Sequence, residues 1–307
     1  MDKRNRTTME FIFIGFSVIP ELQYFLFASF LCIYIISMAA HMFLIVLYNL
    51  SSNLHTPMYF FLANFSFLEK CYISTITPNM LKNFLSKHKT ITFYGCAVQM
   101  YCFLLLGSTE CYVLAAMAYD RYNAICHPLL YNVIMSKNAC VKLIVNSWII
   151  GLMAAIIQTS LTFFLDYCGP NKINNFYCDI APLMALACSD TRFNEILIFM
   201  LVLCVVVGAF LLTIVSYTRI IWTIIMHHSS GGIKKAFSTC TSHLIVVTIF
   251  FGSGCVMYLR PKTSYGTDMD RLLSLMYTVI APLLNPFIYC LRNNDVKVAV
   301  KKMMKIA

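Results

Sequence analysis

Residues 90–122 read TITFYGCAVQMYCFLLLGSTECYVLAAMAYDRY, and they indicate the class of fold. The segment 90–109 contains no Asp, Glu, Lys or Arg, and about 20 predominantly apolar residues are enough for one helix to cross a bilayer. Glu110 follows this run, and Asp120 and Arg121 close it. Because a charge inside a bilayer is costly and usually marks function, the depth of these three residues is the first question that the sequence raises.

The composition agrees with a membrane protein. Of the 307 residues, 60% are hydrophobic and 12% are charged, whereas a soluble domain averages about 25% charged residues. Other uncharged windows are as long, and the longest of them is divided by the polar stretch NLSSNLHTP at 49–57, which has the residues of a turn. We therefore predict seven transmembrane helices. Their expected ranges are 24–48, 57–82, 93–122, 140–162, 196–222, 237–259 and 270–291.

The predicted fold class is an all-α membrane protein, a seven-transmembrane helix bundle over residues 24–291. The continuous apolar runs differ from the alternating segments of a β-barrel, and isolated strands would leave unpaired backbone groups in lipid. Residues 1–23 form an expected extracellular tail, in which FIFIGF (11–16) is too short for a span. Residues 292–307 form a basic tail with apolar side chains at helical spacing, which predicts a short interfacial helix on cytoplasmic lipid.

The orientation rests on cysteines and a sequon. Lys and Arg divide evenly between the two sides, so the positive-inside rule gives no direction. Asn5 begins the sequon NRT, and glycosylation requires a lumenal location. Cys168, Cys178 and Cys188 follow the fourth span and Cys96 opens the third, and disulfides form in oxidising compartments. We expect an extracellular amino terminus and a cytoplasmic carboxyl terminus.

Two acids lie at one depth of the expected bundle. Glu110 is eleven residues from Arg121, a helical distance of about 16 Å that returns to nearly the same face. Glu69, twelve residues after Pro57, reaches a similar depth. Close carboxylates cannot both ionise without a counter-ion. They could hold a cation such as sodium, share a proton, or each bind a separate partner.

We favour the sodium ion or the proton, with Asn285 and Ser66 as further polar groups. No other cofactor is expected. Lys70 is a candidate partner for one of the acids, although its direction differs from that of Glu69 by about 100°.

The end of the third span, Asp120-Arg121-Tyr122, has two interpretations. Spacing alone favours a solvated helix end whose arginine reaches the head groups. The alternative is a local ion pair that holds an inactive state until a partner engages Arg121. In PLLNPFIY (282–289), Pro286 removes a helical hydrogen bond, and Asn285 beside it indicates a hinge near a polar site.

No catalytic motif is present. The chain has no Gly-rich phosphate loop, G-x-S-x-G or H-E-x-x-H, so we expect no enzyme. Cys240 and His243 have C-x-x-H spacing but no second pair follows, which disfavours a metal site. The basic residues are scattered, so no nucleic-acid binding is expected.

Four segments carry a family resemblance: LHTPMYFFLANFSFLE (54–69), MAYDRYNAICHPLLY (117–131), KAFSTCTSHLIVV (235–247) and PLLNPFIYCLRN (282–293). The chain resembles the vertebrate olfactory receptors, a branch of the rhodopsin-like G-protein-coupled receptors, over essentially its whole length. The resemblance implies disulfides Cys96–Cys178 and Cys168–Cys188 in a glycoprotein of the plasma membrane. It also implies that Glu69 and Glu110 match paired acids that look like a sodium site.

The resemblance implies an activation switch whose arginine swings toward Tyr217 and a G protein. The matching residues are Asp120, Arg121, Tyr122, Tyr217, His243, Asn285, Pro286 and Tyr289. Four positions depart from the usual pattern. Ala40-His41 stands where the family usually has Gly-Asn, so the asparagine amide that normally ties the first span to the second and seventh is missing. Glu69 replaces the more common aspartate, and the neighbouring Lys70 is unusual. Phe251 stands where a tyrosine is common.

The function that this resemblance implies is an odorant receptor that raises cyclic AMP through a stimulatory, olfactory-type heterotrimeric G protein. The ligand is expected to be small and mostly apolar, bound in the outer half of the bundle. No aspartate lies in the outer half of the third span, which argues against an amine. The expected ligand-binding residues are Leu104, Ser108, Val202, Val206, Phe251, Cys255, Tyr258 and Thr278.

Two alternatives stay open. A non-olfactory chemosensory receptor of the same fold would share most of these residues. An ion-coupled transporter is supported only by the midplane acids, and it would need repeat symmetry or interrupted helices in corresponding halves, which the sequence does not show.

Overall fold

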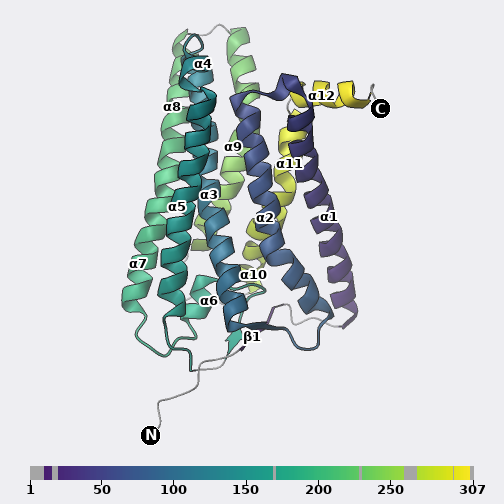
Figure 1. Cartoon of the computed structure of the whole chain (residues 1–307), viewed down its shortest axis with the longest axis vertical. Helices are drawn as coiled ribbons and strands as arrows, with labels where there is room; N and C mark the ends of the chain where they lie inside the picture. The colour runs from purple at the N-terminus through teal and green to yellow at the C-terminus, as the bar shows by residue number, and fades with distance from the viewer. Residues whose placement is uncertain are drawn as a thin grey trace.

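A computed structural model describes residues 10–15, 20–168, 171–227, 230–258, 268–292 and 294–304. Within these ranges it confirms the all-α bundle, in which seven helical rods run side by side (Figure 1). Two of the rods contain a π-helical segment, η2 or η4. The rods are α1 (Pro20–Leu50), α2 (Pro57–Leu85), α3 (Phe93–Cys126), α5 (Lys137–Phe163), α7–η2–α8 (Arg192–Val202, Leu203–Val207, Gly208–His227), α9 (Ser230–Tyr258) and α10–η4–α11 (Asp268–Leu275, Met276–Ile280, Ala281–Arg292).

Most rods extend past the predicted ends because the polar flanks remain helical. α3 continues beyond Tyr122 and stops at Cys126, since His127 precedes Pro128 and a residue before proline avoids the helical conformation. In the part of the chain that the structure describes, five helices are long and apolar enough to cross a membrane. α2 is not one of the five, because Glu69 and Lys70 lower its hydropathy, but it packs between α1 and α3 as a member of the bundle.

α3 is the central rod, packed against α2, α5 and α8. Its approach to α5 depends on Gly151, where an added Cβ would lie 2.1 Å from Thr109 Oγ1 and 2.8 Å from the Leu105 carbonyl oxygen. The glycine therefore allows two backbones to meet beside Glu110. This contact holds α5 against α3, the rod that carries more of the predicted site residues than any other rod.

One end of the bundle, which we call the disulfide end, is closed by a small sheet. β1 (Glu10–Phe13) lies between β2 (Thr90–Thr92), its antiparallel partner, and β3 (Lys172–Ile173), its parallel partner. Phe11 is fully buried between the rings of Phe93 and Tyr167, with centroid distances of 6.1 and 5.6 Å. Phe11, Ile12 and Phe13 of the FIFIGF run therefore belong to a strand, which was not predicted from the sequence.

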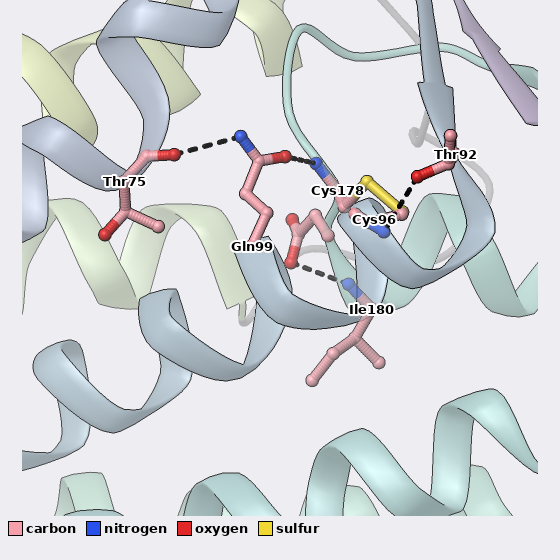
Figure 2. The surroundings of a disulfide bond; sticks show 8 residues. Thr75, Thr92, Cys96, Gln99, Cys178 and Ile180 are labelled. Atoms are coloured by element: carbon pink, nitrogen blue, oxygen red, sulfur yellow. Dashed lines mark hydrogen bonds between the residues drawn. A yellow bond between two sulfur atoms is a disulfide. The ribbon is translucent and has the colours of Figure 1, made fainter.

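Both predicted disulfides are confirmed at this end, with Cα–Cα distances of 5.5 Å for Cys96–Cys178 and 5.9 Å for Cys168–Cys188. Gln99, one turn after Cys96, supports the first bridge (Figure 2). Its amide donates to the Thr75 carbonyl of α2 at 3.1 Å and accepts from the Cys178 backbone N–H at 3.1 Å. One side chain thus joins α2, α3 and the loop that follows α5.

The opposite end, which we call the Arg121 end, carries two short helices. α12 (Asn294–Met304) crosses this end of the rods (Figure 1) and contacts α11 and the turn η1 (Ser52–Leu54). Val296 and Ala299 are buried while Val298 is exposed, so the helix packs through one apolar face. α4 (Tyr131–Ile134) follows α3 and lies beside it.

Asp179 gives the disulfide end a pH dependence. The carboxyl accepts the Ile180 N–H at 2.8 Å at the start of α6 (Ile180–Met184), and burial raises its pKa to about 6. A raised pKa means that the folded state binds more protons than the unfolded state. Stability should therefore fall as pH rises from about 4 to about 6, by on the order of 2 kcal/mol.

We predict that Asp179→Asn flattens this part of the pH profile of the apparent Tm in detergent. Asp166→Asn, a change at an exposed carboxyl of the same loop, should leave the profile as in the wild type. Parallel profiles for Asp179→Asn and the wild type between pH 4 and 6 would contradict the assignment.

Candidate functional site

A series of aromatic rings crosses the bundle between the disulfide end and the midplane acids. Neighbouring ring centroids lie 5.1 to 6.5 Å apart, within the range of favourable aromatic contacts. We call this series the aromatic belt. Its members are Tyr177 of the loop after α5, Phe103 of α3, Tyr72 of α2, Tyr277 of η4, Phe250 and Phe251 of α9, and Phe210 of α8.

The belt passes close to α3 at Gly107. A Cβ at this position would make ordinary van der Waals contact, 3.6 Å from the Tyr277 hydroxyl oxygen and 3.7 Å from Cε2 of Tyr72. The predicted ligand-binding residues Leu104 and Ser108 flank Gly107 and are buried. The belt and these α3 residues therefore meet in one region of the interior.

The other predicted ligand-binding residues differ in exposure. Phe251 and Thr278 are buried, Val202 and Val206 are half-buried, and Cys255 is exposed. The Thr278 hydroxyl donates to the Ser274 carbonyl at 2.7 Å, so its oxygen remains only as an acceptor. The side chain of Tyr258 lies outside the described residues, as does Asn5.

The two predicted acids meet at the centre of the bundle. Glu69 and Glu110 are 1% and 4% exposed, and their side chains interact directly. The Asn285 amide of α11 donates a hydrogen bond to Glu69. Three rods, α2, α3 and α11, therefore converge on one acidic group.

Two buried oxygens beside these acids have no hydrogen-bond partner among the described residues: Ser66 Oγ and Asn285 Oδ1. A buried polar atom without a partner is costly, and oxygen donors with a carboxylate fit a hard cation. The donor set therefore fits sodium. Among the residues that the structure describes, no group of three or more His, Cys, Asp or Glu could hold a metal ion.

His41 ties α1 to α11, although the amide usual at this position is missing. Its Nε2 lies 3.0 Å from the Pro282 carbonyl oxygen, and the ring is 1% exposed. A carbonyl can only accept, so Nε2 carries the hydrogen. Pro286 has no N–H and leaves the carbonyl four residues earlier without a helical donor. The imidazole therefore satisfies the carbonyl that the predicted hinge frees.

At the Arg121 end, the structure shows the ion pair that the spacing alone did not favour. Arg121 Nε donates to Asp120 Oδ2 at 3.0 Å, and its Nη2 contacts the same oxygen. The hydroxyl of Tyr131 on α4 donates to Asp120 Oδ1 at 2.7 Å. Asp120 is fully buried and Arg121 is 9% exposed, so this is not a solvated helix end.

A cavity of about 10 Å³ lies beside the ion pair. Its lining residues are Met58, Met117, Asp120, Arg121, Ser242, His243 and Tyr289. That volume holds about one water. The Tyr217 hydroxyl lies 2.6 Å from Nδ1 of His243. Tyr122 is directed elsewhere and lies 3.1 Å from His127 Nε2.

The predicted switch residues thus form two groups, one at the Arg121 end and one around Asn285 at the midplane. Tyr289 lies between them, because it lines the Arg121 cavity while its ring contacts Phe65 at 6.1 Å. Tyr131, Gln99 and most of the aromatic belt were not predicted from the sequence. No periodic signal distinguishes these rings from the other aromatic residues of apolar spans.

The fold defines the class of protein first. The structure of squid rhodopsin superposes with a TM-score of 0.71 at 20% identity and covers 94% of this chain and 82% of that one. At this identity the match shows the fold alone, that of the rhodopsin-like receptors.

The family follows from the sequence comparisons. The olfactory receptor family model matches residues 30–306. Olfactory receptor 5AR1 of Mus musculus is 49% identical over 99% of this chain and 98% of its own length, and Olfactory receptor 5I1 of Homo sapiens is 46% identical over 99% and 97%. The chain belongs to the olfactory receptor family. It is a multi-pass membrane receptor and not an enzyme, and the family implies an odorant ligand and a G-protein partner.

The contact between His41 and Pro282 predicts non-additive substitutions. His41→Leu leaves a buried carbonyl without a donor and should cost about 1–3 kcal/mol of stability, whereas His41→Asn keeps a donor and should cost less. In Pro286→Ala the new N–H can bond the Pro282 carbonyl, so His41→Leu should cost about 1 kcal/mol less in that background.

Thermal unfolding of the four receptors in detergent measures this double-mutant cycle. Equal losses from His41→Leu in the two backgrounds would show that the imidazole acts through packing rather than through the freed carbonyl.

Proposed function

We propose that the protein is an odorant receptor that activates a stimulatory, olfactory-type G protein and raises cyclic AMP. The observation that carries the proposal is the Asp120–Arg121 pair, buried in a cavity that residues of α9 and α11 also line. Movement of either rod would change the surroundings of Arg121. The bound partner would replace Asp120 and Tyr131 as the arginine's neighbours, as expected of a two-state element.

The proposed location is the plasma membrane, with the disulfide end outside and the Arg121 end in the cytoplasm. The two disulfides support this orientation, because they form in oxidising compartments. It would place the sequon at Asn5 on the outside, where it can be glycosylated. It would also place the basic helix α12 on the anionic inner leaflet.

We propose that the ligand binds next to the aromatic belt, between Leu104 and Ser108 of α3, Val202 and Val206, Phe251 and Thr278. The rings and aliphatic side chains suit a small apolar molecule, and a few hydroxyls would orient one hydrogen-bonding group. Tyr177 belongs to the loop held by Cys178 and Gln99, so that loop would cover the ligand. Cys255, which is exposed on α9, and Tyr258 stay in the proposed set as residues predicted from the sequence.

Arg121→Ala should lower the agonist-stimulated cyclic AMP signal roughly tenfold or more, about 1.4 kcal/mol of coupling, at unchanged surface level. The reason is that the substitution removes the cation that the G protein would engage. Lys142→Ala, an exposed basic residue of α5, serves as the control and should signal normally. A normal agonist response of Arg121→Ala receptors at the cell surface would rule out this role.

A sodium ion between Glu69 and Glu110, with Asn285 and Ser66, should stabilise the inactive state. Replacing external and internal sodium by a large organic cation is then expected to raise basal cyclic AMP in the wild type and not in Glu110→Gln. Glu10→Gln, at an exposed side chain in the first position of β1, should respond as the wild type does. A wild type that ignores sodium but responds to pH would favour a shared proton instead.

The ligand class can be tested with an odorant panel on cells that express the receptor and a cyclic AMP reporter. Small apolar alcohols, ketones and esters are expected to act, and amines are not. For an active alcohol, Ser108→Ala should raise the half-maximal concentration about fivefold, the value of one hydrogen bond of about 1 kcal/mol. An equal shift for a hydrocarbon analogue, or activation by amines alone, would contradict the proposed site.

A further inference from the structure

Lys70 is a cation on the outward side of a membrane helix. It lies in the middle of α2, and its side chain is partly exposed. Its Nζ lies 6.0 Å from the centroid of the Phe67 ring, and Phe67 is 47% exposed. The ammonium group therefore points toward the surroundings of the bundle rather than toward Glu69, which is buried.

The depth of Lys70 keeps it from water. At 1.5 Å per residue, it lies about 20 Å along the helix from Pro57 and about 22 Å from Leu85. The hydrocarbon core of a bilayer is about 30 Å thick, so both head-group regions are about 15 Å away. A lysine near the end of a membrane helix can extend its ammonium group to the head groups. A lysine at the depth of Lys70 is too far from them to do so.

No acid of the described residues is available to Lys70. The ion pair among them is Asp120–Arg121, and the two other acids within the rods, Glu69 and Glu110, face each other in the interior. The nine remaining acids of the described residues lie in the first turn of a helix or outside the rods. They are Glu10, Glu21, Asp166, Asp179, Asp190, Glu195, Asp268, Asp270 and Asp295.

We propose that the outward face of α2 around Lys70 binds a transmembrane helix of a different protein, and that this helix carries a carboxylate at mid-bilayer depth. Charge complementarity selects this occupant. A second copy related by two-fold symmetry would bring another lysine to the contact, and it has no outward acid at this depth. Lipid tails offer no counter-charge at the midplane.

The rest of the face suits a helix. One turn from Lys70, the half-buried Ser74 donates to the Lys70 carbonyl at 2.8 Å and lies 3.1 Å from the hydroxyl of Tyr34 on α1. Small and polar side chains are enriched where membrane helices pack, because they allow close approach and hydrogen bonds. The Lys70 face thus combines a cation, one polar residue and one exposed ring, flanked by α1.

The test uses a synthetic single-span probe of leucine and alanine with one central glutamate, beside a matched glutamine probe. Energy transfer between labelled probe and full-length receptor in phosphatidylcholine vesicles measures association. The wild type should bind the glutamate probe roughly tenfold more tightly than the glutamine probe. Lys70→Leu should abolish that preference, Lys70→Arg should keep it, and Lys70→Glu should prefer a central-lysine probe.

Lys82→Leu, at an exposed lysine in the last turn of α2, is the matched control and should keep the preference. All variants are compared at equal apparent Tm. Equal binding of both probes by the wild type, or loss of preference in Lys82→Leu, would overturn the proposal. So would energy transfer between receptor copies that falls in Lys70→Leu, since that outcome identifies a second copy as the occupant.

Discussion

A polar group that enters the interior of this bundle must find its partner within the protein, because hydrocarbon supplies none. The rods meet this requirement for their own backbones by being helical. Where a rod is broken, a side chain from another element completes the hydrogen bond. His41 does so for the Pro282 carbonyl freed by Pro286, and Gln99 does so for a backbone N–H of the loop at the disulfide end.

The same requirement explains the charges on α3. Glu110 lies against Glu69, which accepts a hydrogen bond from Asn285, and Asp120 neutralises Arg121. In neither arrangement are all hydrogen-bonding groups paired with partners from other rods. The midplane acids leave oxygens without donors, and the arginine is held by its own neighbour in sequence. Both are therefore suited to exchange partners, which is what a receptor with two states requires.

The fold could be predicted from uncharged windows of membrane-spanning length, since that signal is local. The depth of Glu69, Glu110 and Arg121 followed from helical rise alone. What the sequence could not predict depends on contacts between distant segments. The strand at Glu10–Phe13, the bond from Tyr131 to Asp120 and the ring series around Tyr277 have no periodicity of their own. Helical spacing predicted that Arg121 is solvated, whereas its side chain is buried and paired with Asp120. The spacing within one helix does not show that α4 and α9 cover this side chain.

The central place of β1 in its sheet has a consequence for assembly. Its two partners, residues 90–92 and 172–173, lie in loops that exist only after the second and fourth rods have been made. Pairing across such sequence distances is slow compared with helix formation. β1 is thus synthesised before both of its partners and is among the last elements to reach its final position, so the disulfide end can close only after the rods between these segments have formed.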